Sequence, residues 1–310
     1  MYKRSMKVEN PFVELRLLKV IRPYIVVGGF LGYLVGVLYS LNLEGTISWT
    51  RFALGYLIVL FEDLSTHYNN DYYDLEIDRH APFKPFGSVN LFIEHPELRG
   101  SAFLVSVWLS VVSIILALTL VKMGVGWHLI IVVTLFNIVG WLYSAPPIRL
   151  HSRRLGEVAI ALGTGYSIPA VGYILTQGNL DGVFTLFSAP LMLYGFILSL
   201  CLQVPDYEVD RAMNKKTIVG FIGRRKTYYA VLFSAIAANI VYFFLFPKTT
   251  PFFSMVKWIS LIPVASSLSS ILFLSDAPEQ AKLFTKLNVS ALFLFLVGLN
   301  IMLLLNLVIF

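Results

Sequence analysis

Long apolar runs constrain the fold of this chain more than any other feature of its sequence. A helix that crosses the hydrocarbon core of a bilayer needs roughly 20 mostly apolar residues. These runs show no period-two alternation, so membrane helices are predicted rather than a barrel. The nine predicted spans cover residues 21–41, 52–70, 101–122, 126–143, 157–176, 183–204, 227–247, 255–274 and 287–309.

The composition supports a chain that is solvated by lipid. Only 14% of the 310 residues are charged, whereas 57% are hydrophobic; an average soluble domain carries about a quarter charged residues. The single cysteine, Cys201, excludes an internal disulfide framework. No Gly-, Ser- or Pro-rich linker divides the sequence, which predicts one polytopic membrane domain over residues 1–310.

The basic residues predict how this domain is oriented. Lys and Arg are enriched in cytoplasmic loops of membrane proteins. With the N-terminus inside, the outer segments hold only Arg51, Lys122, Lys248 and Lys257, so 20 of the 24 basic residues lie inside. This placement predicts a cytoplasmic N-terminus, and it accounts for the net charge of +6 without a nucleic-acid partner. Residues 1–20 are predicted to form an amphipathic segment on the membrane surface.

A first cluster of carboxylates ends the second predicted span. Asp71, Asp74 and Asp78 are spaced i, i+3 and i+7, and therefore share one face of a helix. His67 and Asn70 lie on or beside the same face. Three like charges on one face repel each other unless a cation lies among them. Their all-oxygen ligand set suits Mg²⁺ or Ca²⁺ better than zinc.

A second cluster ends the sixth predicted span. Asp206 and Asp210 are spaced i, i+4, and Gln203 lies one turn earlier on the same face. A solvated helix end is the alternative for either cluster alone. Both clusters, however, are predicted at the inner membrane face, so they can face each other across one cavity. This predicts two metal ions bridged by a polyanionic substrate such as a diphosphate. The offset of four spans also fits a parallel duplication of spans 1–4 and 5–8.

Other residues near these clusters are candidates for substrate contacts. The segment Tyr143-Ser-Ala-Pro-Pro-Ile-Arg149 ends the fourth span in an extended turn. This turn would present Tyr143 and Arg149 toward the space between the spans, and Tyr72 lies within the first acidic motif. Glu62 and Asp63 lie deeper in the second span. The sequence leaves two interpretations open for them: functional groups, or an internal hydrogen-bonded pair. Candidate phosphate ligands are Arg79, Arg149, Lys215 and Lys216.

These motifs together resemble those of the UbiA superfamily of intramembrane prenyltransferases. The matching patterns are Asn70-Asp71-x-x-Asp74-x-x-x-Asp78, Tyr143-Ser-x-Pro-Pro-x-Arg149-Leu and Asp206-x-x-x-Asp210-Arg. The resemblance implies an all-α fold of nine transmembrane helices around a central cavity that opens to the bilayer. It also implies that the Asp motifs hold Mg²⁺ on a prenyl diphosphate, from geranyl to polyprenyl, near the cytoplasmic face.

The acceptor of the prenyl group stays open between two branches of this superfamily. Leu155-Gly-Glu157 and the Gly-rich span after it resemble the menaquinone branch, which implies an aromatic quinone precursor as acceptor. The run Asp74-Leu-Glu-Ile-Asp78 resembles the branch that acts on hydroxybenzoate or on glyceryl phosphate ether lipids. Two departures from common family patterns are His151, where many members have Lys, and the segment Lys84-Pro-Phe-Gly-Ser88.

Two other classes of membrane protein compete with this interpretation. An ion-coupled transporter also places carboxylates in the membrane, but its sites lie near the midplane rather than at one face. A CDP-alcohol phosphatidyltransferase also binds metal through Asp residues, but in one contiguous stretch that contains an Asp-Gly-x-x-Ala-Arg unit. This chain lacks that unit.

Overall fold

The computed structural model describes residues 14–43, 45–75, 79, 91–245, 251–275 and 277–309. Among these residues there is no β-strand, only an isolated bridge between Arg153 and Lys216. Three features predicted from the sequence lie outside the described residues. They are most of the predicted surface segment 1–20, the third aspartate of the first motif, and the segment after that motif: residues 1–13, Asp78 and Lys84–Ser88.

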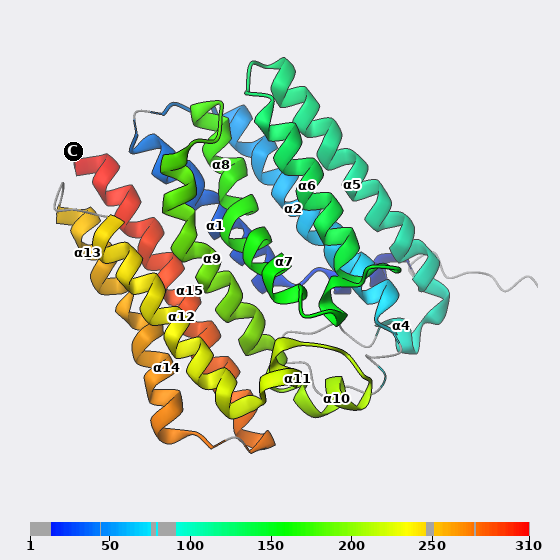
Figure 1. Ribbon diagram of the computed structural model, residues 1–310. Helices are drawn as coiled ribbons and strands as arrows, with labels where there is room; N and C mark the ends of the chain where they lie inside the picture. Colours follow the sequence, from blue (N-terminus) through cyan, green and yellow to red (C-terminus); the bar gives the residue numbers. More distant parts are fainter. Residues whose placement is uncertain are drawn as a thin grey trace, which may run out of the picture.

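Long helices overlap each of the nine apolar runs in the sequence (Figure 1). Seven of these runs are single helices: α1 (Pro23–Leu41), α2 (Trp49–Tyr73), α5 (Arg99–Lys122), α6 (His128–Ser144), α9 (Gly182–Gln203), α12 (Arg224–Leu245) and α15 (Pro278–Ile309). The other two are composite: α7 (Gly156–Leu162), a π-helical turn η4 (Gly163–Ser167) and α8 (Ile168–Gln177); then α13 (Pro251–Ile259) and α14 (Leu261–Phe273).

Seven helical runs in the described part of the chain are long and apolar enough to cross a membrane. Helices α2 and α6 are the two that do not reach this standard. α6 has only 17 residues. α2 has 25 residues but holds Glu62, Asp63 and Asp71 within its length. The helix that carries the first acidic motif is therefore the one whose sequence is least typical of a span.

The helices pack closely where glycines face a neighbouring backbone. α1 lies along α8, α2 lies against α5 and α6, and α9 packs on α7 and α12. In α1, a Cβ atom added to Gly36 would lie 2.7 Å from the carbonyl carbon of Pro169 and closer still to its oxygen. In α8, a Cβ atom on Gly172 would lie 2.8 Å from the backbone nitrogen of Val37. Glycine thus allows α1 and α8 to approach each other at backbone distance.

We expect Gly36→Ala to destabilise the protein by about 1–3 kcal/mol, because α1 and α8 must separate to admit the methyl group. The unfolding temperature in detergent measures this effect. Gly100→Ala in α5 is the matched control, since nothing lies within 4 Å of a Cβ atom there and Ala favours a helix over Gly. Equal unfolding temperatures for the two variants would contradict the close approach of α1 and α8.

Several short helices gather at one end of the bundle, opposite the C-terminus (Figure 1). They are α4 (Leu91–Glu94), α10 (Tyr207–Ala212) and α11 (Ile218–Ile222). We call this the motif end, because α2 and α9 finish here; the first acidic motif lies in the last turn of α2, and the second follows α9. The 3₁₀-helix η1 (Glu14–Val20) joins it, with Leu17 and Val20 buried against Leu64 and Tyr68 of α2.

Candidate active site

The first acidic motif lies in the last turn of α2. Asp71 is in the helix, and Asp74 is its C-cap residue, whose N–H donates to the carbonyl oxygen of Asn70. Both carboxylates are buried, with exposed fractions of 5% and 6%. A buried charge is costly unless it is paired, so the partners of these two residues define the site.

Arg22 pairs with Asp71 across the start of α1. One guanidinium nitrogen of Arg22 lies 2.8 and 3.1 Å from the two carboxylate oxygens of Asp71. Its other terminal nitrogen lies 3.3 Å from Nδ1 of His67, one turn earlier on α2. Arg22 is the N-cap of α1 and is followed by Pro23 at the first helical position. The first span therefore delivers a cation directly onto the first acidic motif.

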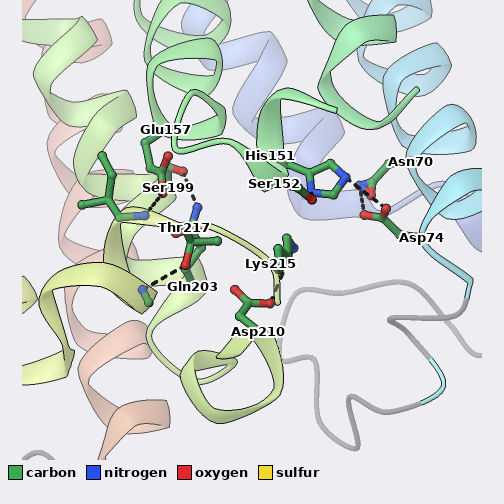
Figure 2. Close-up of polar contacts among 12 residues, drawn as sticks. Asn70, Asp74, His151, Ser152, Glu157, Ser199, Gln203, Asp210, Lys215 and Thr217 are labelled. Carbon is green, nitrogen blue, oxygen red and sulfur yellow. Dashed lines mark hydrogen bonds and ion pairs between the residues drawn. The ribbon is translucent and has the colours of Figure 1, made fainter. Parts of the chain in front are cut away.

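His151 and Asn70 surround Asp74 (Figure 2). Nε2 of His151 lies 3.1 Å from Oδ1 of Asp74, and the amide of Asn70 donates to Oδ2 at 3.4 Å. His151 belongs to the 3₁₀-helix η3 (Leu150–Ser152), which follows the Pro-Pro turn after α6. Its ring centre lies 5.5 Å from that of Tyr143 at the end of α6. The turn thus brings a buried imidazole to the motif.

The second acidic motif folds back after α9 onto the same end of the bundle. Asp206 is the N-cap of α10, and Asp210 lies inside that helix with only 2% of its surface exposed. Nζ of Lys215 lies 3.7 Å from Oδ1 of Asp210. Burial raises the pKa of Asp210, while the charges of Lys215 and His151 act in the opposite direction.

Lys215 connects the two motifs electrostatically. Burial alone would lower its pKa, but Asp210, Asp74, Tyr143 and Asp206 outweigh burial and raise the pKa above the ordinary value. Asp74 also acts to raise the pKa of Asp210. In Figure 2 Lys215 lies between Asp210 and the pair of Asp74 and His151. Carboxylates from both motifs therefore share one electrostatic environment.

Side-chain oxygens hold the loop that carries Lys215 by accepting hydrogen bonds from backbone N–H groups. The buried carboxylate of Glu157 at the start of α7 accepts a hydrogen bond from the N–H of Ile218 at 2.7 Å. The hydroxyl of Thr217 caps α11 by accepting from the N–H of Gly220 at 2.9 Å. These contacts fix the chain on the C-terminal side of Lys215.

A cavity of about 420 Å³ opens from this site into the bundle. Arg22, His67, Asn70 and Tyr143 line its polar part, and Asp63 lines it farther along α2. The apolar part is formed by side chains of α6, α9 and α15: Phe136, Leu191, Leu198, Leu292, Phe295 and Leu296. The cavity can therefore hold a molecule with a polyanionic head and a hydrocarbon body.

The other predicted site residues differ in burial and in the side chains that they contact. Gln203 is the last residue of α9 and is half-buried; it donates to Oγ of Ser199 at 3.3 Å, and its buried Oε1 lacks a hydrogen-bond partner. Tyr72 instead packs against Phe103 and lies under Arg99, 4.6 Å from its guanidinium carbon. Among the predicted phosphate ligands only Lys215 is largely buried; the exposed ones are Arg79, Arg149 and Lys216.

Arg22 and His151 are site residues that the sequence did not single out. Each reaches the first motif through tertiary packing, because Arg22 lies 49 residues before Asp71 in the chain. A charged residue immediately before the Pro that starts a span was the available signal for Arg22. For His151 the signal was its position directly after the Arg149-Leu turn, where many UbiA members have Lys.

The donor set fits magnesium that is completed by a substrate. No group of three His, Cys, Asp or Glu side chains in the described residues is close enough to hold an ion alone. Mg²⁺ typically takes one or two carboxylates, and substrate phosphates and water supply the rest. Asp210 is a buried carboxylate whose pKa is raised by burial, so a cation beside it is favourable. Asp71, Asp74, Asp206 and Asp210 would hold the ions.

The chain is similar in sequence to two curated proteins and in fold to a solved structure. The chain is 28% identical over 218 residues to digeranylgeranylglyceryl phosphate synthase of Thermococcus gammatolerans, covering 68% of this chain and 71% of that protein. It is 26% identical over 232 residues to a lycopene elongase/hydratase of Haloarcula japonica, covering 74% of each chain. A UbiA homologue from Archaeoglobus fulgidus, solved with DMAPP and Mg²⁺, has a TM-score of 0.64 at 16% identity, covering 91% of this chain and 99% of that one.

A match to one family model extends over most of the chain. The model of the UbiA prenyltransferase family matches residues 30–299, which include both acidic motifs. With its apolar helices of spanning length, the protein is an integral, multi-pass membrane protein. The chain belongs to the UbiA prenyltransferase family.

Proposed function

We propose that this protein transfers a polyprenyl group from a prenyl diphosphate to a lipophilic acceptor within the membrane, with Mg²⁺ as cofactor. The cavity carries this proposal, because Arg22, His67 and Asn70, which belong to the first acidic motif or contact it, line one end of a mostly apolar space. The Archaeoglobus homologue, solved with DMAPP and Mg²⁺, adds support for the donor.

The chain's own residues divide the work of binding the donor. Asp71, Asp74, Asp206 and Asp210 would hold two Mg²⁺ ions, which would neutralise charge on the departing diphosphate. Arg22 and Lys215 point cationic groups at the same end of the site, where they bind phosphate oxygens. Asn70 and His151 orient the carboxylate of Asp74.

The apolar body of the cavity protects the reacting prenyl group. When the C1–O bond to the diphosphate breaks, the allylic C1 becomes cation-like, and water would capture it. Phe136, Leu198 and Phe295 exclude water along the cavity. Tyr143 lines the polar part of the cavity, and the face of its ring is suited to stabilise the cation-like C1.

The charge distribution supports an orientation with this site near the cytoplasm. In that orientation nine helices cross the membrane, including α2 and α6, and the N-terminus is cytoplasmic. The exposed Arg149 and Lys216 at the motif end then lie at the inner surface, where basic residues are favoured. Their predicted role as phosphate ligands is explained more simply by this surface position.

Two acceptor classes have specific support. The Leu155-Gly-Glu157 resemblance favours an aromatic quinone precursor. The names of two relatives, the digeranylgeranylglyceryl phosphate synthases of Thermococcus gammatolerans and Korarchaeum cryptofilum, favour a glyceryl phosphate ether lipid. An ion-coupled transporter finds no support in these comparisons.

The test is transfer by the purified protein in detergent with Mg²⁺ and geranylgeranyl diphosphate. The acceptor panel holds dihydroxynaphthoate, hydroxybenzoate, homogentisate, geranylgeranylglyceryl phosphate and lycopene, and mass spectrometry detects the prenylated product. We expect product with one acceptor class. Absence of product with every acceptor, together with no Mg²⁺-dependent binding of the donor, would contradict the proposal.

A further inference from the structure

One face of α2 continues the polar surface of the site two turns into the membrane. Asp63, Thr66, His67 and Asn70 all line the cavity, at the i, i+3, i+4 and i+7 positions of one helical face. Asp63 is the deepest of these groups and the only acidic residue among the described residues that line the cavity. The donor-binding motif does not account for it.

The neighbouring helix leaves room for this carboxylate. Gly28 and Gly29 of α1 line the cavity opposite Asp63. A Cβ atom added to Gly29 would collide with Oδ2 of Asp63 and would lie 3.7 Å from its Cγ. Glycine weakens a helix by roughly 0.5–1 kcal/mol relative to alanine. The space for Asp63 is therefore built into α1 at some cost in helix stability.

Asp63 differs from its neighbour Glu62 in having no partner. Within the described residues no hydrogen bond or ion pair reaches Asp63. Glu62 points toward α6, is 1% exposed, and accepts a hydrogen bond from Asn137 of that helix at 2.9 Å. A charge at the centre of a membrane helix costs roughly 2.5–3.5 kcal/mol. Glu62 is part of a packed polar network, whereas the side chain of Asp63 lines the cavity.

The position of Asp63 excludes a role as a third metal ligand. It precedes Asp71 by eight residues, which places it about 12 Å farther along the helix axis. Ligand oxygens lie about 2.0–2.1 Å from Mg²⁺, so Asp63 and Asp71 cannot share an ion. An acceptor that attacks C1 must lie beyond the diphosphate along the cavity. This is the space between the motif and Asp63.

We propose that Asp63 binds the acceptor's O–H group and takes the proton that the transfer releases; this inference rests on the proposed function. The acceptor forms a bond to C1 of the prenyl group as the C1–O bond breaks, and that electron pair leaves with the diphosphate. The proton lost by the acceptor passes to a carboxylate oxygen of Asp63, which later returns it to water. Positive charge developing at C1 also favours a nearby carboxylate.

Asp63 also restricts the class of acceptor. The end of the acceptor that meets Asp63 is uncharged and donates a hydrogen bond, because a carboxylate or phosphate there would be repelled. Any anionic group of the acceptor must therefore lie at its other end, near Arg22. A phenol or an alcohol meets this requirement through its hydroxyl group.

Asp63→Asn tests the proposal, with Glu62→Gln as the matched control on the same turn. Two quantities are measured for each variant and for the unaltered protein: Mg²⁺-dependent binding of geranylgeranyl thiolodiphosphate, and single-turnover transfer to whichever hydroxylated acceptor of the panel reacts. We expect Asp63→Asn to bind the donor analogue within about threefold of the unaltered protein. Its transfer rate should fall roughly 10²-fold or more, while Glu62→Gln transfers at a near-normal rate.

Each outcome separates this inference from the proposed function. Transfer by Asp63→Asn within about fivefold of normal would overturn the role of Asp63 and leave the prenyltransferase function intact. Equal losses in donor binding and transfer would also overturn it, because Asp63 would then support the donor site or the fold. Failure of the unaltered protein to bind the donor analogue or to form product would instead contradict the proposed function.

Discussion

Asp71→Ala and Asp206→Ala, made separately, are each expected to abolish prenyl transfer while the protein stays folded in detergent. Each variant removes one carboxylate from one acidic motif. Loss of a single group that stabilises a developing charge typically costs about 10²–10³-fold in rate, and loss of a metal ligand removes more than one such contact. Product formation from geranylgeranyl diphosphate measures the effect, and gel filtration with thermal unfolding checks the fold.

Glu97→Ala is the control for this pair. Glu97 also lies at the motif end, in the 3₁₀-helix η2 (Pro96–Leu98), but its side chain is 58% exposed and it does not line the cavity. Its variant should retain near-normal activity. Near-normal turnover in both Asp71→Ala and Asp206→Ala would contradict a site that holds metal on each motif. If only one of the two variants loses activity, only the motif altered in that variant is needed for transfer.

The helices could be predicted from the sequence because their signal is local. Residues 21–41 and 183–204 were predicted as spans, and the helices found there are Pro23–Leu41 and Gly182–Gln203. Hydrophobicity summed along the chain finds such segments without tertiary information. The π-helical turn Gly163–Ser167 was not predicted, because it depends on packing. Its Gly165 lies where a Cβ atom would meet the backbone of Met192 on α9 at 2.5 Å or less.

The acidic motifs were also visible in the sequence, since residues three and four apart share a helix face. The contacts between elements were not. Arg22 meets Asp71 only because α1 starts at the side of the bundle where α2 ends. His151 meets Asp74 only because the turn after α6 folds beneath α2. Asp63 and Glu62 are adjacent in sequence, yet only the structure shows that one faces the cavity and the other faces α6.

Chelation of divalent metal is expected to stop the reaction completely, and added Mg²⁺ should restore it. The physical reason lies in the charge of the site: Asp210 is a buried carboxylate whose pKa is raised by burial, and Lys215 at 3.7 Å is its closest cation in the described residues. A diphosphate brings further negative charge to this place. Without metal, Arg22 and Lys215 alone must compensate for the carboxylates and the diphosphate together.

The measurement is a titration of EDTA against transfer activity, followed by a return of Mg²⁺ in excess. Asp210→Asn provides an internal check, because it weakens one ligand and should raise the Mg²⁺ concentration that gives half-maximal activity. Glu97→Ala, which leaves every ligand in place, should follow the curve of the unaltered protein. Activity that persists in excess EDTA would contradict the metal assignment. Asp210→Asn with an unchanged Mg²⁺ requirement would exclude this residue as a ligand, and Asp206 would then be the sole metal ligand supplied by the second motif.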